Sequence, residues 1–292
     1  MSQNSGRMKN RVCLITGATS GIGKATAIGL AEMGATVVIL SQDHSRGEIV
    51  KKEIVERTKN NSIDVMKGDL GSLKSIQEFS LNFKEQYNEL HILINNAGVY
   101  TNRRIETDDG YEKMFVVNHL GHFFLTNLLL YVLKQSSPSR IVNVASRAQR
   151  ALNFDDLQSE KHFSMMKVYG QSKLANILFT YELARRIEDS GVTVNCLHPG
   201  IVRTNLGHEM PWIMRNGKKL VMLMAKSPKK GAETSIFLAS SPEVNHISGK
   251  YFVNKQVKES TPTSYDVEVA KHLWEESESL IRAIIPEFST SL

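Results

Sequence analysis

Residues 15 to 34 read "ITGATSGIGKATAIGLAEMG", and this stretch decides the fold class. Gly17, Gly21 and Gly23 form a G-x-x-x-G-x-G pattern after the apolar run 11–16, "RVCLIT", and before a helical pattern. Glycines at such a turn let backbone N–H groups approach a pyrophosphate, which the positive end of the helix dipole also attracts. The pattern predicts a strand, a turn that binds a dinucleotide, and a helix. A strand-to-helix turn without a ligand is the alternative.

The same stretch partly matches the P-loop, a motif that binds nucleoside triphosphates. A P-loop has Ser or Thr after its Gly-Lys pair, whereas Ala25 follows Lys24 here. Its first glycine would have to stand at Ala18. Nucleotide triphosphate hydrolysis is therefore disfavoured.

Strand-like and helical patterns alternate along the rest of the chain. The further strand-like runs are 35–40, 63–68, 91–96, 140–146, 192–198 and 249–254. Between two of them, Ser72 can cap a helix that reaches Tyr87, with Ser75 at its third position. Repeated strand–helix–strand order is typical of a parallel sheet with helices on both faces. The sequence predicts an α/β fold: a polar N-terminal segment, 1–10, and one Rossmann-type domain, 11–292, with a doubly wound parallel sheet of about seven strands.

The composition is that of a soluble protein with a sizeable core. The chain has 292 residues, 41% hydrophobic and 23% charged. Its net charge of +6 comes from scattered short pairs such as Lys51–Lys52, which favour solvated helix faces over nucleic-acid binding. The first ten residues lack the apolar centre of a signal peptide, and no run of about eighteen apolar residues occurs. We therefore expect a cytoplasmic protein that does not bind nucleic acid.

The two cysteines, Cys13 and Cys196, both lie in apolar strand-like runs, far apart in the sequence. Neither has a second Cys or a His cluster at metal-binding spacing. We expect buried, reduced packing residues and no metal site.

The pattern Tyr-x-x-x-Lys occurs twice, as Tyr169/Lys173 in "YGQSK" and as Tyr251/Lys255 in "YFVNK". Chance matches are common in a chain with 8 Tyr, so local structure has to separate the two copies. The first lies in a continuous helical periodicity, where four residues rise about 6 Å and return to one face. The second follows Gly249 in a strand-like run, where four residues span about 13 Å. Only Tyr169 and Lys173 are therefore expected to share a site.

Several motifs occur together in one order along the chain. They are "TGATSGIG" (16–23), "NNAG" (95–98), Asn118 in "VVNHLG", Ser146 in "IVNVAS", "YGQSK" (169–173) and "HPG" (198–200). In this order and spacing, residues 10–255 resemble the short-chain dehydrogenase/reductase family. The stretches "YGQSKLANILFTYELARRI" and "HPGIVRT", and the long segment between Ser146 and Tyr169, are most similar to its retinol-dehydrogenase-like branch.

The resemblance implies a nicotinamide-dependent oxidoreductase with four catalytic residues, Asn118, Ser146, Tyr169 and Lys173. A free phenol has a pKa of about 10, and the ammonium of Lys173 would favour the phenolate of Tyr169, the acid and base. By resemblance, Lys173 would also hold the nicotinamide ribose, Ser146 would bind the substrate oxygen, and Asn118 would anchor a water on the proton path. Taken singly, Asn118 could equally satisfy backbone groups beside its helix, and Ser146 could cap a strand end.

The resemblance also implies cofactor contacts along the carboxyl ends of the strands. The residues are Gly17, Ser20, Gly21, Ile22, Gly23, Ser41, Gln42, Asp69, Leu70, Asn95, Ala97, Gly98, Tyr169, Lys173, Pro199, Gly200 and Thr204. Ser41 stands where an NAD enzyme has an acid, and Gln42 stands where related retinol dehydrogenases have Arg. With His44 and Arg46 nearby, the sequence favours NADP, whereas Asp43 leaves NAD open.

After Thr204 the chain is rich in Met, Leu and Trp, with basic residues between them. By resemblance, residues 204–228 form a lid over the substrate, and their composition favours an apolar carbonyl or alcohol. A packing helix pair, and a surface helix that contacts a membrane through 211–226, are the alternatives. The loop 147–168 either shapes a wall of the pocket or is a surface excursion. The resemblance also admits a homodimer through the helix that bears Tyr169.

The sequence thus predicts an NADP-preferring carbonyl reductase or alcohol dehydrogenase that acts on a small hydrophobic substrate. The alternative is a catalytically silent NAD(P)-binding regulatory protein on the same fold. The presence of Asn118, Ser146, Tyr169 and Lys173 together disfavours that alternative, because a silent protein has no chemical need for all four.

Overall fold

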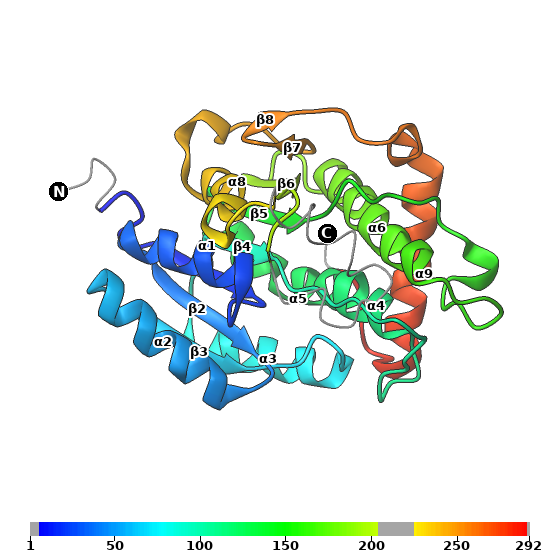
Figure 1. The fold of residues 1–292 in the computed structure, drawn as a ribbon, viewed down its shortest axis with the longest axis horizontal. Coiled ribbons are helices and arrows are strands. Elements are labelled where there is room, and N and C mark those ends of the chain that lie inside the picture. Colours follow the sequence, from blue (N-terminus) through cyan, green and yellow to red (C-terminus); the bar gives the residue numbers. More distant parts are fainter. Residues whose placement is uncertain (1–5, 204–224, 291–292) are drawn as a thin grey trace.

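The computed structural model describes residues 6–203 and 225–290, and its centre is one sheet (Figure 1). In these residues the sheet has eight strands in the order β3-β2-β1-β4-β5-β6-β7-β8. They are β1 (Val12–Thr16), β2 (Thr36–Ser41), β3 (Ile63–Lys67), β4 (Ile92–Asn95), β5 (Ser139–Val144), β6 (Val192–His198), β7 (Tyr251–Val253) and β8 (Gln256–Val257). The first seven pair in parallel, and the order reverses between β1 and β4. The predicted doubly wound parallel sheet is confirmed.

The short strand β8 was not predicted. It pairs antiparallel with β7 through a turn at Asn254 and Lys255, whose φ angles are 51° and 65°. Two successive positive φ angles are typical of a two-residue hairpin turn. Because β8 has only two residues, no periodicity in the sequence could indicate it.

Helices cover both faces of the sheet (Figure 1). Helices α1 (Gly21–Glu32), α2 (His44–Thr58) and α8 (Pro228–Ser240) pack on one face. The other face carries α3 (Leu73–Gln86), α5 (Gly121–Gln135) and α6 (Met165–Arg186), with α9 (Val267–Ile284) against them. Shorter turns are α4 (Lys113–Phe115), the π-helical turn η1 (Val116–Leu120), and the 3-10 turns η2 (Phe154–Asp156), η4 (Pro242–Val244) and η5 (Pro262–Tyr265).

Two local predictions are confirmed. The Ser72 hydroxyl caps α3 by accepting a hydrogen bond from the backbone N–H of Ser75 at 3.3 Å. Cys13 and Cys196 are both free and fully buried, and burial raises the pKa of each thiol to about 12. Both thiols therefore stay protonated near neutrality and act as packing groups.

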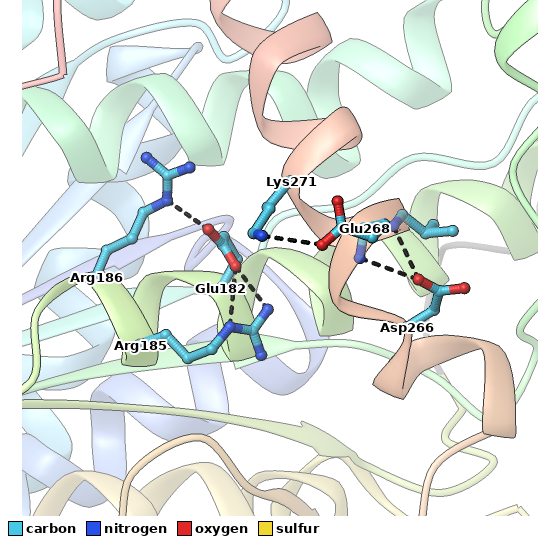
Figure 2. Close-up of polar contacts among 7 residues, drawn as sticks. Glu182, Arg185, Arg186, Asp266, Glu268 and Lys271 are labelled. Carbon is cyan, nitrogen blue, oxygen red and sulfur yellow. Dashed lines mark hydrogen bonds and ion pairs between the residues drawn. The ribbon is translucent and has the colours of Figure 1, made fainter.

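Helix α9 packs along α6, and Figure 2 shows the polar contacts of both helices. Glu182 on α6 accepts hydrogen bonds from Arg185 and Arg186 of the same helix. The guanidinium of Arg186 lies 4.2 Å from the centre of the Trp274 ring on α9, a cation–π distance. The same ring meets Phe123 of α5 edge to face, with centroids 4.7 Å apart. This face of α6 is therefore covered within the chain.

One helical stretch in the described residues, Lys113–Gln135, is long and apolar enough to cross a membrane. It comprises α4, η1 and α5, and 89% of its most apolar window is buried inside the fold. Burial of this kind is that of a central core helix.

The residues predicted as a lid, 204–228, lie mostly outside the described residues, and so does the membrane segment 211–226. The described residues on either side are joined. The N–H of Lys226 donates to Ile201 at 2.8 Å, and the N–H of Arg203 donates to Lys226 at 3.0 Å. The described residues before 204 and after 224 therefore lie side by side, just beyond the end of β6.

Candidate active site

The glycine turn between β1 and α1 is packed too closely for side chains. Gly17 has a φ of 64°, and a Cβ at this position would lie 2.7 Å from the Cα of Ala97. A Cβ at Gly23 would collide with the carbonyl of Gly17 and the amide of Asn96. The helix starts without a side-chain cap, because Ser20 at its N-cap makes no such hydrogen bond. Its first N–H groups are therefore available to an anion.

A cavity of about 690 Å³ lies over the carboxyl ends of the strands, beside this turn. Fifteen of the predicted cofactor residues line it: Gly17, Ser20, Gly21, Ile22, Gly23, Ser41, Gln42, Asp69, Leu70, Ala97, Gly98, Tyr169, Lys173, Pro199 and Gly200. The fold therefore brings together residues that are up to 183 positions apart, from Gly17 to Gly200. Thr204 lies outside the described residues.

The prediction that Asn95 lines the cavity is wrong. Its side chain is buried, and it donates to Thr126 at 2.9 Å and to Asn143 at 2.8 Å. The next residue, Asn96, lines the cavity instead. Successive side chains of a strand point to opposite sides, so an error of one position inverts the direction.

Tyr169 and Lys173 lie on one face of α6, as predicted. The Lys173 ammonium is 5.7 Å from the centre of the Tyr169 ring, and it donates to the carbonyl of Val144 at 3.1 Å. Burial lowers the pKa of Lys173 to about 8. Burial also raises the pKa of the Tyr169 phenol above its usual value, while the hydroxyl of Ser146 acts in the opposite direction. Desolvation is the largest of these contributions, so the phenol pKa is raised and not lowered as the nearby Lys173 had led us to expect.

Ser146 lies two residues beyond β5, and its loop is held from two sides. The Ser146 hydroxyl accepts from the N–H of Ala148 at 3.1 Å. The Ser146 carbonyl accepts from the amide of Gln149 at 2.9 Å and from the phenol of Tyr251 at 3.3 Å. Tyr251 belongs to the second Tyr-x-x-x-Lys copy, and it lies on β7 as predicted, while Lys255 pairs with Glu233 at 3.5 Å. The tyrosine of the second copy therefore supports the loop that carries Ser146.

Asn118 lies in the π-helical turn η1 and is fully buried. Its amide oxygen accepts from the N–H of Val99 at 2.7 Å, and its amide nitrogen donates to the carbonyl of Val99 at 3.1 Å. The same nitrogen donates to the hydroxyl of Ser172 on α6 at 3.1 Å. The side chain of Asn118 thus joins the loop after β4 to α6, next to Lys173.

Comparison with known proteins assigns this arrangement to a family. The sequence profile described as short chain dehydrogenase matches residues 11–211. The chain belongs to the short chain dehydrogenase family. It is accordingly an NAD(P)-dependent oxidoreductase of that type, which confirms the prediction made from its motifs.

Named relatives and a solved structure are similar over nearly the whole chain. Human retinol dehydrogenase 14 is 44% identical over 94% of this chain and 88% of its own length. Human polyprenol dehydrogenase is 42% identical over 92% of this chain and 84% of its own length. The crystal structure of an uncharacterised protein from Mycobacterium paratuberculosis is 31% identical, with a TM-score of 0.77, and covers 96% of both chains. The predicted retinol-dehydrogenase-like branch is confirmed.

In this short chain dehydrogenase, one end of the cavity lies at the carboxyl ends of β2 and β3. The hydroxyl of Ser41 donates to the backbone of Asp43 at 2.6 Å, and the amide of Gln42 donates to Asp69 at 2.8 Å. The carboxylate of Asp43 accepts from the N–H of Arg46 at 3.0 Å and so caps α2. Arg46 itself lines the cavity.

Sequence reasoning missed some residues that the fold of this dehydrogenase brings to the site. Tyr100, Met166 and Ile201 line the same cavity as Tyr169, and no motif contains Tyr100 or Met166. Ile201 directly follows "HPG", so its position in that segment was the available signal. Sequence reasoning also missed His122, which lies in "VVNHLGHFFLT". It follows Asn118 by four positions, and this helical spacing could have indicated that the two residues are neighbours.

Proposed function

We propose that this dehydrogenase transfers a hydride between NADP and an apolar carbonyl or alcohol, with Tyr169 as acid and base. One observation carries the proposal: Tyr169 and Lys173 line the same cavity as the glycine turn, Gly17 to Gly23. A turn that suits a pyrophosphate and a phenol that suits a carbonyl oxygen can then serve one bound cofactor and its substrate.

The side chains around Tyr169 have separate roles in this proposal. Bound NADP(H) supplies or accepts the hydride. In the reduction direction, the buried phenol of Tyr169 gives its proton to the substrate oxygen, and the ammonium of Lys173 stabilises the phenolate that is left. The hydroxyl of Ser146 donates to the same substrate oxygen. Asn118 holds Val99 and its loop beside Lys173; its role as an anchor for a water stays a prediction.

NADP is proposed over NAD because of the residues after β2. The position of Ser41 carries no acid, and the carboxylate of Asp43 already caps α2. Arg46 lines the cavity at this end. Arg pairs with a phosphate through two parallel hydrogen bonds, which suits the 2′-phosphate of NADP.

The proposed substrate is an alcohol or aldehyde with a long apolar chain. The relatives named above are a retinol and a polyprenol dehydrogenase, and both of those alcohols are isoprenoids. The site contributes its own argument, because the cavity wall near Tyr169 consists of apolar and aromatic side chains. We propose either direction of the reaction, as carbonyl reductase or as alcohol dehydrogenase.

Turnover of wild type and Tyr169→Phe tests the proposal. Oxidation of NADPH and NADH is followed by nicotinamide absorbance with medium-chain aldehydes, retinal, quinones and keto-steroids. Removal of the phenolic O–H should lower kcat about 10²- to 10⁴-fold, the usual contribution of a positioned acid. The Kd for NADPH, measured by fluorescence, should stay within about twofold. Tight cofactor binding by the wild type, with no turnover in either direction, would instead support the silent NAD(P)-binding alternative.

The cofactor preference has its own test in Arg46→Ala. Loss of the guanidinium should raise the Kd for NADPH about tenfold or more and leave the Kd for NADH unchanged. His44→Ala is the matched control, since His44 also lies in the first turn of α2 but does not line the cavity. An equal effect of Arg46→Ala on both cofactors would refute the NADP assignment.

We also propose a cellular location and an oligomeric state for this protein. We propose a cytoplasmic protein with peripheral membrane contact through 211–226, which flotation with phospholipid vesicles tests. We also propose a homodimer through α6; because residues 170–183 are buried within the chain, the contact would have to involve the ends of this helix. Sedimentation at micromolar concentration measures whether it forms.

A further inference from the structure

The two ends of the cavity differ in charge. At the ends of β2 and β3, the lining includes Asp43, Arg46 and Asp69. Around Tyr169, Lys173 is the one charged lining residue in the described part of the chain. The other side chains there are apolar or aromatic: Val99, Tyr100, Ala145, Ala148, Met166 and Ile201. The Tyr169 end is therefore suited to the uncharged part of a ligand.

Tyr100 is a fixed part of this wall. Its ring meets the Tyr169 ring edge to face, with centroids 5.0 Å apart. Behind the ring, Tyr100 packs in a small apolar cluster with Met114 and Val168, and only 8% of it is exposed. Its phenol donates to the sulfur of Met166 at 2.8 Å. Tyr100 is thus held on three sides, with one edge at the cavity.

Met166 and Ile201 are the exposed large apolar side chains of the cavity lining in the described part of the chain. Met166 is 46% exposed and Ile201 is 63% exposed, although both are large apolar side chains. They come from α6 and from the segment after β6, so they reach the cavity from two different elements. Exposed apolar side chains that converge on a cavity favour an apolar ligand. A thioether is flexible and polarizable, so Met166 can adapt to ligands of different shape.

We propose that Tyr100, Met166 and Ile201 bind the apolar chain of the substrate next to its reacting oxygen and so set the preference for chain length. This inference rests on the proposed function of Tyr169. Tyr100 provides the rigid aromatic part of this wall. Met166, whose sulfur accepts a hydrogen bond from Tyr100, provides the part that can adapt to the ligand.

Chain-length profiles of Met166→Glu, Met166→Leu and Leu81→Glu test the inference. For wild type, kcat/KM for the linear aldehydes from propanal to decanal should rise up to about fourfold per methylene until the wall is covered. Met166→Glu should flatten this rise, because a carboxylate at the wall has to be desolvated. Met166→Leu should keep the wild-type profile. Leu81→Glu is the matched control, since Leu81 is 53% exposed on α3 and does not line the cavity.

A binding measurement makes the inference independent of turnover. The Kd of the linear alcohols from butanol to decanol is measured by calorimetry with NADPH bound, a combination that cannot react. The same rise in affinity per methylene is expected for wild type, and the same flattening for Met166→Glu. A wild-type profile in Met166→Glu would overturn the inference. Chain-length-dependent binding without turnover of any aldehyde would contradict the proposed function and leave the binding wall established.

Discussion

The imidazole of His122 lies 2.9 Å from the hydroxyl of Thr16. The other ring nitrogen, Nδ1, lies 3.1 Å from the backbone oxygen of Asn118 and must carry a hydrogen, because a carbonyl only accepts. Nε2 then accepts from Thr16, whose oxygen also accepts the N–H groups of Asn96 and Ala97 at 2.9 Å each. Burial lowers the pKa of His122 to about 3, so the ring is neutral. His122 therefore joins the strand before the glycine turn to the turn that carries Asn118.

His122→Phe should destabilise the protein and weaken the cofactor site. The variant removes the hydrogen bonds that His122 makes with the Asn118 carbonyl and the Thr16 hydroxyl, and losing such a partner typically costs about 1–3 kcal/mol for a buried group. Urea unfolding measures the loss, and the Kd for NADPH should rise in parallel. His162→Phe at an exposed position is the control. If His122→Phe and His162→Phe were equally stable, the hydrogen bonds of His122 would not contribute to stability.

Stability should fall as the pH is lowered from about 6.5 to 4. Burial lowers the pKa of His119 to about 4, of His122 to about 3 and of His198 to about 4. Below the unfolded pKa of about 6.5, the unfolded chain binds protons that the folded protein does not, so each histidine adds a slope of up to about 1.4 kcal/mol per pH unit. Urea unfolding at several pH values tests this. His122→Phe should show a shallower slope, and an identical slope would exclude His122 as a contributor.

The rate of carbonyl reduction should decline above about pH 8. Burial lowers the pKa of Lys173 to about 8, and its ammonium stabilises the Tyr169 phenolate in the proposed mechanism. As the pH rises through that value, Lys173 loses its proton and the charge that favours the reaction. The dependence of kcat on pH, measured with saturating NADPH and decanal, tests this. A rate that is constant up to pH 10 would show that Lys173 remains charged during turnover.

Gly23→Ala should abolish tight cofactor binding. The added methyl group would collide with the backbone carbonyl of Gly17 and with the side-chain amide of Asn96, and the carbonyl cannot move without opening the turn. We expect the Kd for NADPH to rise at least about tenfold, as measured by fluorescence titration. Gly29→Ala on the same helix is the control, because its added methyl group meets only the flexible side chain of Ile236. Wild-type affinity in Gly23→Ala would refute the close packing of this turn.

Trp274→Ala should loosen α9 and lower the stability of the whole domain. The indole is 2% exposed and packs on Phe123 and Phe179, under the guanidinium of Arg186. Replacing a buried Trp by Ala costs about 3–5 kcal/mol through lost contacts and the cavity left behind. Urea unfolding should show the loss, and Trp274→Phe should recover part of it. Sedimentation of Trp274→Ala also shows whether the uncovered face of α6 associates.

Much of the site could be predicted because its residues come from local motifs. The glycine turn, "NNAG", the Tyr169 helix and "HPG" each have a recognisable local pattern, and in a parallel sheet they all follow strand ends. Asn95 was placed wrongly because a strand alternates its side chains, and the end of β4 lies one residue earlier than its motif indicates. Tyr100 and Met166 were missed because neither has a local pattern that distinguishes it from a core residue.

The sequence by itself determined the order of strands and helices, the turn for a dinucleotide, and which Tyr–Lys pair shares a face. Those features depend on local periodicity and on glycine, which act over a few residues. Only the tertiary structure decided that burial raises the pKa of Tyr169, that Tyr251 supports Ser146, and that α9 packs against α6. Desolvation and long-range hydrogen bonds depend on what packs around a group, and residues distant in sequence supply that surrounding.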